Sequence, residues 1–92
     1  MTTLTKDPDA VLDYTVDWTA FLTSVTDTIL TSEFVIDEDA DITLTNETLD
    51  DNQHTVFIAG GTVNTRYRIT SRITTAGGRT QDQSFLLVVA EQ

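Results

Sequence analysis

The chain has 92 residues, no cysteine and a formal net charge of −10, so it holds one hydrophobic core without disulfides or thiolate metal sites. The acidic balance excludes a nucleic-acid-binding protein, because most of the surface would repel phosphate. No stretch approaches the ~20 apolar residues of a membrane helix, and no apolar run follows Lys6 as it would in a signal peptide.

The first part of the chain predicts an extended arm, a strand, a helical turn and a second strand. Residues 1–9 are expected to form the arm, because Pro8 has no backbone N–H and so interrupts the hydrogen bonds between paired strands. Over residues 12–18 apolar and polar side chains alternate, which is the period of a strand with one buried face. A helical turn over 19–22 leads to a strand over 28–36, whose buried face is expected to carry Leu30, Phe34 and Ile36.

The middle of the chain predicts two further strands separated by a polar loop. Ile42 and Leu44 alternate with threonines in the first of these strands, and residues 46–53 are expected to form the loop. The second strand covers residues 54–59 and ends at two consecutive glycines, which permit the positive φ of a tight turn.

The last part predicts two strands joined by a turn over residues 76–78. The strand over residues 65–74 has two faces, one carrying Tyr67, Ile69, Ser71 and Ile73 and the other carrying Arg66, Arg68, Thr70 and Arg72. In the strand over residues 83–90 the core-facing set is expected to be Phe85, Leu87 and Val89.

The fold class follows from these elements and from the composition. Nineteen of the 92 residues are threonine, a β-branched residue that suits the pleated surface of a sheet. Turns recur every 8–14 residues along the chain, a spacing typical of a β-sandwich. The sequence therefore predicts an all-β fold in which residues 1–92 form a single domain.

Four stretches form a recognisable set: KDPDAVLDY at residues 6–14, Asp17-Trp18, GGT at residues 60–62 and RITTAGGRT at residues 72–80. Over almost the whole chain, from Lys6 to Ala90, the sequence resembles a family of small structural proteins of tailed bacteriophages, often labelled fibre–tail adaptors. The resemblance implies a small immunoglobulin-like antiparallel β-sandwich that docks on larger virion parts in multiple copies.

Two groups of titratable residues are candidates for chemistry. Asp37, Asp39 and Asp41 have the alternate spacing of a calcium loop, but the glycine and glutamate that an EF-hand also needs are missing. His54 is the only histidine, and no nucleophile motif accompanies it. The sequence therefore predicts a solvated acidic turn, a structural histidine, and no catalytic residue, metal site or cofactor.

Charge is distributed unevenly, and this points to a candidate interface. Residues 1–65 carry thirteen acids and one base, whereas residues 66–92 carry four arginines and two acids. Arg66, Arg68 and Arg72 project from one face of one strand, and guanidinium groups pair well with carboxylates. We expect them either to dock on an acidic partner or to pair with aspartates on neighbouring strands.

Leu86 and Val88 complete the candidate interface. They point away from the core-facing side chains of the last strand, so this strand is apolar on both faces. Such a run indicates that something covers the outer face. The cover is expected to be either residues 1–12 of the same chain or another protein.

Together with these features, the resemblance implies a non-enzymatic structural component of a tailed bacteriophage particle, assembled in the host cytoplasm. The leading interpretation is an adaptor at the tail or the head–tail junction. Its expected partners are tail, fibre, connector or major capsid proteins, with no nucleic acid and no membrane. The alternatives are a capsid head decoration protein and a calcium- or carbohydrate-binding module of a fibre.

Overall fold

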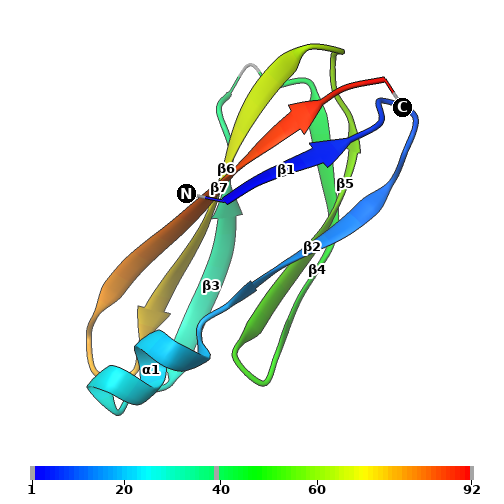
Figure 1. Cartoon of the computed structure of the whole chain (residues 1–92). Coiled ribbons are helices and arrows are strands. Elements are labelled where there is room, and N and C mark those ends of the chain that lie inside the picture. The colour runs from blue at the N-terminus through cyan, green and yellow to red at the C-terminus, as the bar shows by residue number, and fades with distance from the viewer. Residues whose placement is uncertain (1, 39, 92) are drawn as a thin grey trace.

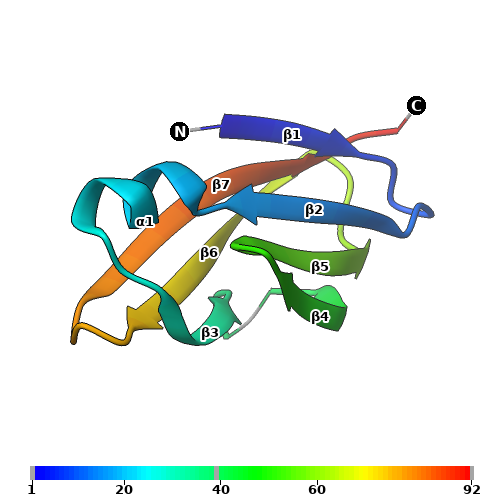
Figure 2. The ribbon, with the colours of Figure 1, turned by 90° about the horizontal axis from the view of Figure 1, so that it is seen from below.

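Two β-sheets pack face to face around the core (Figure 1). The structure is a computed structural model that describes residues 2–38 and 40–91. The larger sheet has the strand order β1-β7-β6-β3 and the smaller β2-β5-β4, and Figure 2 shows both layers from below. The elements are β1 (Thr2–Lys6), β2 (Leu12–Asp17), α1 (Thr19–Val25), β3 (Ile29–Val35), β4 (Ile42–Asp50), β5 (Gln53–Gly60), β6 (Thr65–Thr75) and β7 (Thr80–Val89). The predicted all-β sandwich is confirmed.

One edge of the larger sheet is parallel. β1 runs alongside β7 in the same direction, from Thr2 opposite Phe85 to Lys6 opposite Val89. The other strand pairs are antiparallel. The predicted antiparallel sandwich therefore has one parallel edge, and residues 2–6 of the expected arm belong to the sheet.

Lys6 anchors this edge strand. Its side chain is fully buried, and its ammonium group donates hydrogen bonds to the backbone oxygens of Asp7 at 2.7 Å and Gly60 at 2.8 Å. Its own backbone oxygen accepts a hydrogen bond from Ala90 N at 2.8 Å. A buried ammonium group needs such acceptors to offset its lost hydration. Lys6 thus ties β1 to the ends of β5 and β7.

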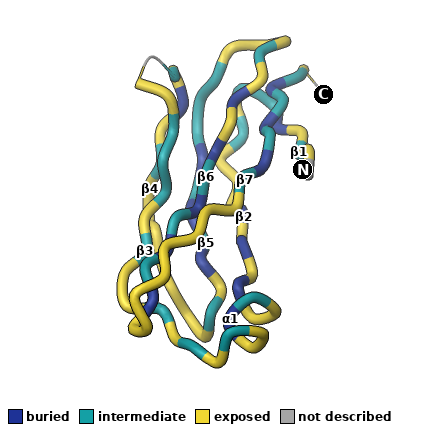
Figure 3. Tube along the Cα trace, turned by 90° about the vertical axis from the view of Figure 1, so that its left-hand side faces the viewer, coloured by how far each residue is buried: buried dark blue, intermediate teal, exposed yellow. Residues whose placement is uncertain are grey.

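The core lies where the inward faces of the strands meet. Buried and less buried residues alternate along β6 and the second half of β7, as the colours in Figure 3 show. The fully buried aliphatic side chains come from both sheets: Val56, Ile58, Ile69, Ile73, Leu87 and Val89. Burying each contributes roughly 1.5–3 kcal/mol. The alternation predicted for these strands is confirmed.

The polar loop predicted over residues 46–53 is wrong. β4 continues to Asp50 and β5 begins at Gln53, so only Asp51 and Asn52 form the turn. Both have positive φ, 51° and 70°, as a two-residue hairpin turn requires. The strand predicted at Ile42 and Leu44 is the first half of β4, and alternation could not reveal its second half, because that part of this edge strand has no buried face.

Leu30 was also placed wrongly, since it is 67% exposed. The register of β3 against β6 shifts between Ile29 and Thr31, and an irregularity of this kind changes which residues face inward. Ile29 packs against the core in place of Leu30, whereas Phe34 and Ile36 pack there as predicted. The helical turn expected over 19–22 is longer than predicted, because α1 runs from Thr19 to Val25. In the described part of the chain, no helix is long and apolar enough to cross a membrane.

Candidate functional site

Four of the five predicted interface residues lie together on the outer face of the larger sheet. Arg66 stands opposite Val88, and Arg68 stands opposite Leu86, in the pairing of β6 with β7. Directly opposite residues of an antiparallel pair share one face, and the buried residues of both strands occupy the other face. Arg66, Arg68, Leu86 and Val88 are called the outer-face patch below.

Threonines of β1 border the outer-face patch. Thr3 is the register partner of Leu86, and Thr5 is the partner of Val88. Because β1 lies beside β7 within the sheet, residues 2–6 flank the patch and do not cover it. Leu86 and Val88 are only half-buried. They lie between the threonines of β1 and the arginines of β6, and the long aliphatic stems of arginines shield apolar neighbours.

Arg72 differs from the other two arginines because it is paired within the chain. Its Nε and Nη2 donate to the two carboxylate oxygens of Asp82 at 2.8 and 3.0 Å, and Glu33 lies 4.0 Å away. The hydrogen bonds with Asp82 raise the pKa of Arg72, and the guanidinium lowers the pKa of Asp82. Within residues 2–38 and 40–91, neither Arg66 nor Arg68 has an ion pair within 4.0 Å.

The acidic loop between β3 and β4 contains the carboxylates with calcium-like spacing. Asp39 lies outside the described residues. Asp41 accepts hydrogen bonds from the hydroxyls of Thr62 and Tyr67, and these bonds, the one from Thr62 foremost, lower its pKa. No group of three or more His, Cys, Asp or Glu side chains that could hold a metal ion occurs among the described residues. Asp41 ties this loop to the start of β6.

His54, which is fully buried, is the centre of a polar network that was not predicted from the sequence. Its Nδ1 lies 2.7 Å from Ser71 Oγ, and its Nε2 lies 2.9 Å from Glu47 Oε2. Trp18 Nε1 donates to the same Ser71 oxygen at 2.9 Å. Phe34 stacks on the imidazole with 3.9 Å between ring centroids. Both ring nitrogens of His54, the Ser71 hydroxyl and the Trp18 indole N–H therefore each have a hydrogen-bond partner, as buried polar groups require.

This network orders a carboxylate, an imidazole and a hydroxyl as a hydrolase triad does, but a nucleophile must reach its substrate. Ser71 is fully buried and does not line the surface hollows beside α1, β2 or β6. The arrangement is therefore that of a structural network. A signal for it was present in the sequence, since Ser71 is a polar residue in the inward row between Ile69 and Ile73.

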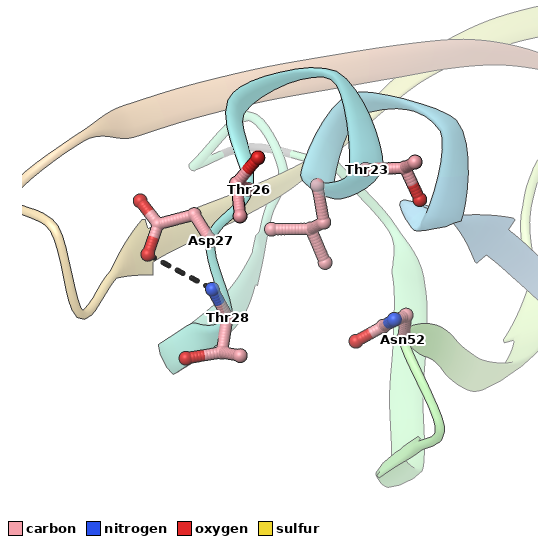
Figure 4. A pocket seen from close by; sticks show the side chains of 6 residues that line it. Thr23, Thr26, Asp27, Thr28 and Asn52 are labelled. Atoms are coloured by element: carbon pink, nitrogen blue, oxygen red, sulfur yellow. Dashed lines mark hydrogen bonds between the residues drawn. The ribbon is translucent and has the colours of Figure 1, made fainter.

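A surface hollow of about 440 Å³ lies at the end of the sandwich near α1 (Figure 4). Among the described residues that line it, Asp27 is the titratable one. Its carboxylate accepts hydrogen bonds from the backbone nitrogens of Thr28 at 2.9 Å and Gly77 at 3.0 Å, and from Arg79 at 2.8 Å. These bonds clamp the start of β3 to the turn between β6 and β7. Asp27 thus has a structural role that occupies both its carboxylate oxygens.

Comparison with known proteins gives a family match that covers most of the chain. The profile of the family described as "Podophage GP4 fiber-tail adaptor protein gp77" matches residues 6–88. The matched range includes β2 to β6 entirely and β7 up to its penultimate residue. No curated protein matches the chain. The match confirms the resemblance that the sequence showed.

Proposed function

Since the chain belongs to the podophage GP4 fiber-tail adaptor family, we propose that it is a non-enzymatic adaptor of the phage tail that holds tail and fibre proteins through its outer-face patch. Family membership makes the chain a structural component of the virion. Such a component acts by contact, so its working part is a surface. We further propose that it is incorporated in multiple copies during assembly in the host cytoplasm.

The observation that carries this proposal is a register relationship: two arginines without an ion pair among the described residues lie opposite two half-buried aliphatic side chains. Protein interfaces combine an apolar centre with arginines, and a few such residues supply most of the binding energy. The chain carries 15 acidic residues and only 5 Lys or Arg residues. Arg66 and Arg68 therefore form a basic site on an acidic chain, which favours a partner rich in carboxylates and disfavours partners of unlike charge pattern.

The test removes the two charges and follows incorporation into particles. Arg66→Gln with Arg68→Gln should reduce the amount of this protein in purified virions about tenfold or more, while its thermal unfolding stays unchanged, because exposed charges contribute little to stability. The matched control is Arg72→Gln with Arg79→Gln, which removes the same charge at arginines paired within the chain.

Normal incorporation of the folded Arg66 and Arg68 double variant would contradict the proposed interface. A head decoration protein, the alternative from the sequence, is distinguished by copy number. A tail adaptor is expected in roughly 6–12 copies per particle and a decoration protein in hundreds, because each follows the symmetry of its attachment site. Quantitative mass spectrometry of whole virions measures this number.

A further inference from the structure

The two sheets of the sandwich differ in charge. They form separate layers, so their outer faces point in opposite directions (Figure 2). β2, β4 and β5, the strands of the smaller sheet, contain four acidic residues and no lysine or arginine. The larger sheet carries Arg66 and Arg68, which have no ion pair within 4.0 Å in the described chain. Carboxylates and unpaired guanidinium groups therefore lie on opposite sides of the molecule.

An aromatic side chain lies on the outer face of the smaller sheet. Tyr14 and Val56 are buried in the core, so Asp13 and Phe57, their neighbours along β2 and β5, point outward. Phe57 stands between Asp13 and Thr45 in the pairing of the three strands. It is half-buried although it points away from the core. Because aromatic residues are enriched at protein interfaces, this face is a candidate contact surface.

Two further carboxylates lie on the same face as Phe57. Gln53 is the register partner of Asp17 on β2 and of Asp50 on β4, and all three are exposed. The fourth acid, Glu47, is turned toward His54. Among the described residues, none of the three aspartates on this face has an ion pair within 4.0 Å. Asp13, Asp17, Asp50 and Phe57 are called the acidic face below.

The acidic face and the outer-face patch have the same spacing between a charged and an apolar side chain. Arg68 lies directly opposite Leu86 on the neighbouring strand, and Asp13 lies directly opposite Phe57. Neighbouring strands are about 4.8 Å apart in any sheet, so the two separations match. When Leu86 of one molecule lies on Phe57 of another, Arg68 is within reach of Asp13. A guanidinium group and a carboxylate then pair through two hydrogen bonds.

We propose that a carboxylate-rich partner of the outer-face patch is the acidic face of a second copy of this chain. The inference rests on the proposed function, since it names a partner for the same patch. Phe57 and the aliphatic pair form the apolar centre of the contact, and the arginines and aspartates form its polar rim. Because the two faces differ, the contact is head-to-tail and leaves one patch and one acidic face available to further copies. Contacts of this kind build open rows or closed rings.

The first experiment measures self-association of the whole chain by sedimentation velocity and exchanges charges between the two faces. The net charge of −10 makes copies repel one another, so the wild type is expected to associate weakly, at about 0.1–1 mM. Arg66→Glu with Arg68→Glu, and separately Asp13→Lys, should each weaken this association about tenfold or more, because like charges then meet. A mixture of the two variants should associate like the wild type, because every contact between unlike copies again joins opposite charges.

Asp9→Lys is the matched control for Asp13→Lys. It changes the net charge by the same amount, but Asp9 lies in the turn before β2 and outside the acidic face. This variant should associate at least as strongly as the wild type, because the repulsion between copies is reduced. Thermal unfolding checks that all the variants are folded.

A second experiment needs no variant, because it follows the NMR signals of the wild type on dilution. The signals of Phe57 and those of Leu86 and Val88 should shift together with concentration. A shift at only one of the two faces, a monomer at about 1 mM, or a mixture of the charge variants that stays monomeric would overturn the inference.

The outcome of these experiments is independent of the test of the proposed function. If the mixture stays monomeric while Arg66→Gln with Arg68→Gln still lowers incorporation into virions, the contact between copies is wrong and the outer-face patch binds a different virion protein. If the mixture associates while those Gln variants are incorporated normally, the contact between copies is supported and the proposed function fails.

Discussion

Ser71 Oγ lies 2.7 Å from His54 Nδ1, and this hydrogen bond joins the two sheets of the sandwich. Ser71 belongs to β6 of the larger sheet, and His54 belongs to β5 of the smaller one. The same serine oxygen accepts a hydrogen bond from Trp18, which follows β2. A single buried hydroxyl thus satisfies polar groups of two other residues, His54 and Trp18, in a core whose other members are mostly aliphatic.

Ser71→Ala is expected to lower the free energy of unfolding by about 1–3 kcal/mol, because it leaves polar atoms of His54 and Trp18 buried without a partner. Urea denaturation followed by tryptophan fluorescence measures the change. Ser84→Ala is the matched control, since its hydroxyl bonds Thr70 on the outer face and its loss should cost about 0.5 kcal/mol or less. Equal stability of the two variants would show that the network contributes nothing.

The clamp at Asp27 predicts a dependence of stability on pH. The pKa of this carboxyl is lowered from the usual 3.8 to about 2, mainly by the hydroxyl of Thr75 and then by the backbone of Thr28, with Arg79 and Gly77 adding to it. Because the pKa is lower in the folded state, the ionised carboxylate stabilises the fold fully above 3.8, and this contribution disappears as the pH falls through about 2.

The stability difference between the wild type and Asp27→Asn should therefore be largest near neutral pH. It should shrink steadily as the pH falls from about 4 to about 2. Denaturant titrations at a series of pH values measure it, with Asp9→Asn, a substitution at a carboxyl far from this clamp, as the control. A difference that stays constant over this range would mean that Asp27 acts through its shape and not through its charge.

The acidic loop between β3 and β4 is expected to bind calcium no more tightly than about millimolar, because the remaining ligands of a calcium loop are missing. The structure adds a reason, since Thr62 and Tyr67 already donate to the Asp41 carboxylate. Isothermal titration calorimetry with calcium chloride checks the affinity. A micromolar dissociation constant would contradict this prediction and favour the metal-dependent fibre module.

The sequence predicted the fold where side chains alternate strongly, as they do along β6 and the second half of β7. It failed at the second half of β4, where an edge strand buries too few residues to show a period, and at Leu30, where a register shift reverses the expected face. The contact between His54 and Ser71 could not be predicted, because alternation assigns a residue to the inside of a sheet and does not say which strand of the other sheet it meets.

The same limit applies to the candidate site. Alternation placed Arg66, Arg68, Leu86 and Val88 on outward faces, but only the register of β6 against β7 sets each arginine opposite an aliphatic side chain. The pairing of Arg72 with Asp82 also follows from that register. From the sequence, the arginines were expected either to dock on an acidic partner or to pair with aspartates on neighbouring strands. Arg72 takes the second alternative, because it pairs with Asp82.

The last prediction concerns the two aliphatic residues of the outer-face patch. It tests whether their side chains serve binding to a partner and not the stability of the domain. Leu86→Thr with Val88→Lys should leave the isolated domain folded, because both side chains point out of the core and are only half-buried. The same change should reduce incorporation into virions about tenfold or more, since it removes the apolar centre of the proposed interface. Thermal unfolding and the protein content of purified particles measure the two effects separately.

Phe85→Ala is the matched control on the neighbouring position and should show the opposite behaviour. Phe85 is 4% exposed and stacks on Tyr14 with 5.8 Å between ring centroids, so its truncation should cost about 3–5 kcal/mol of stability. If the variant with Leu86 and Val88 replaced folds and is incorporated normally, the aliphatic pair takes no part in assembly. The contact surface would then rest on Arg66 and Arg68 alone.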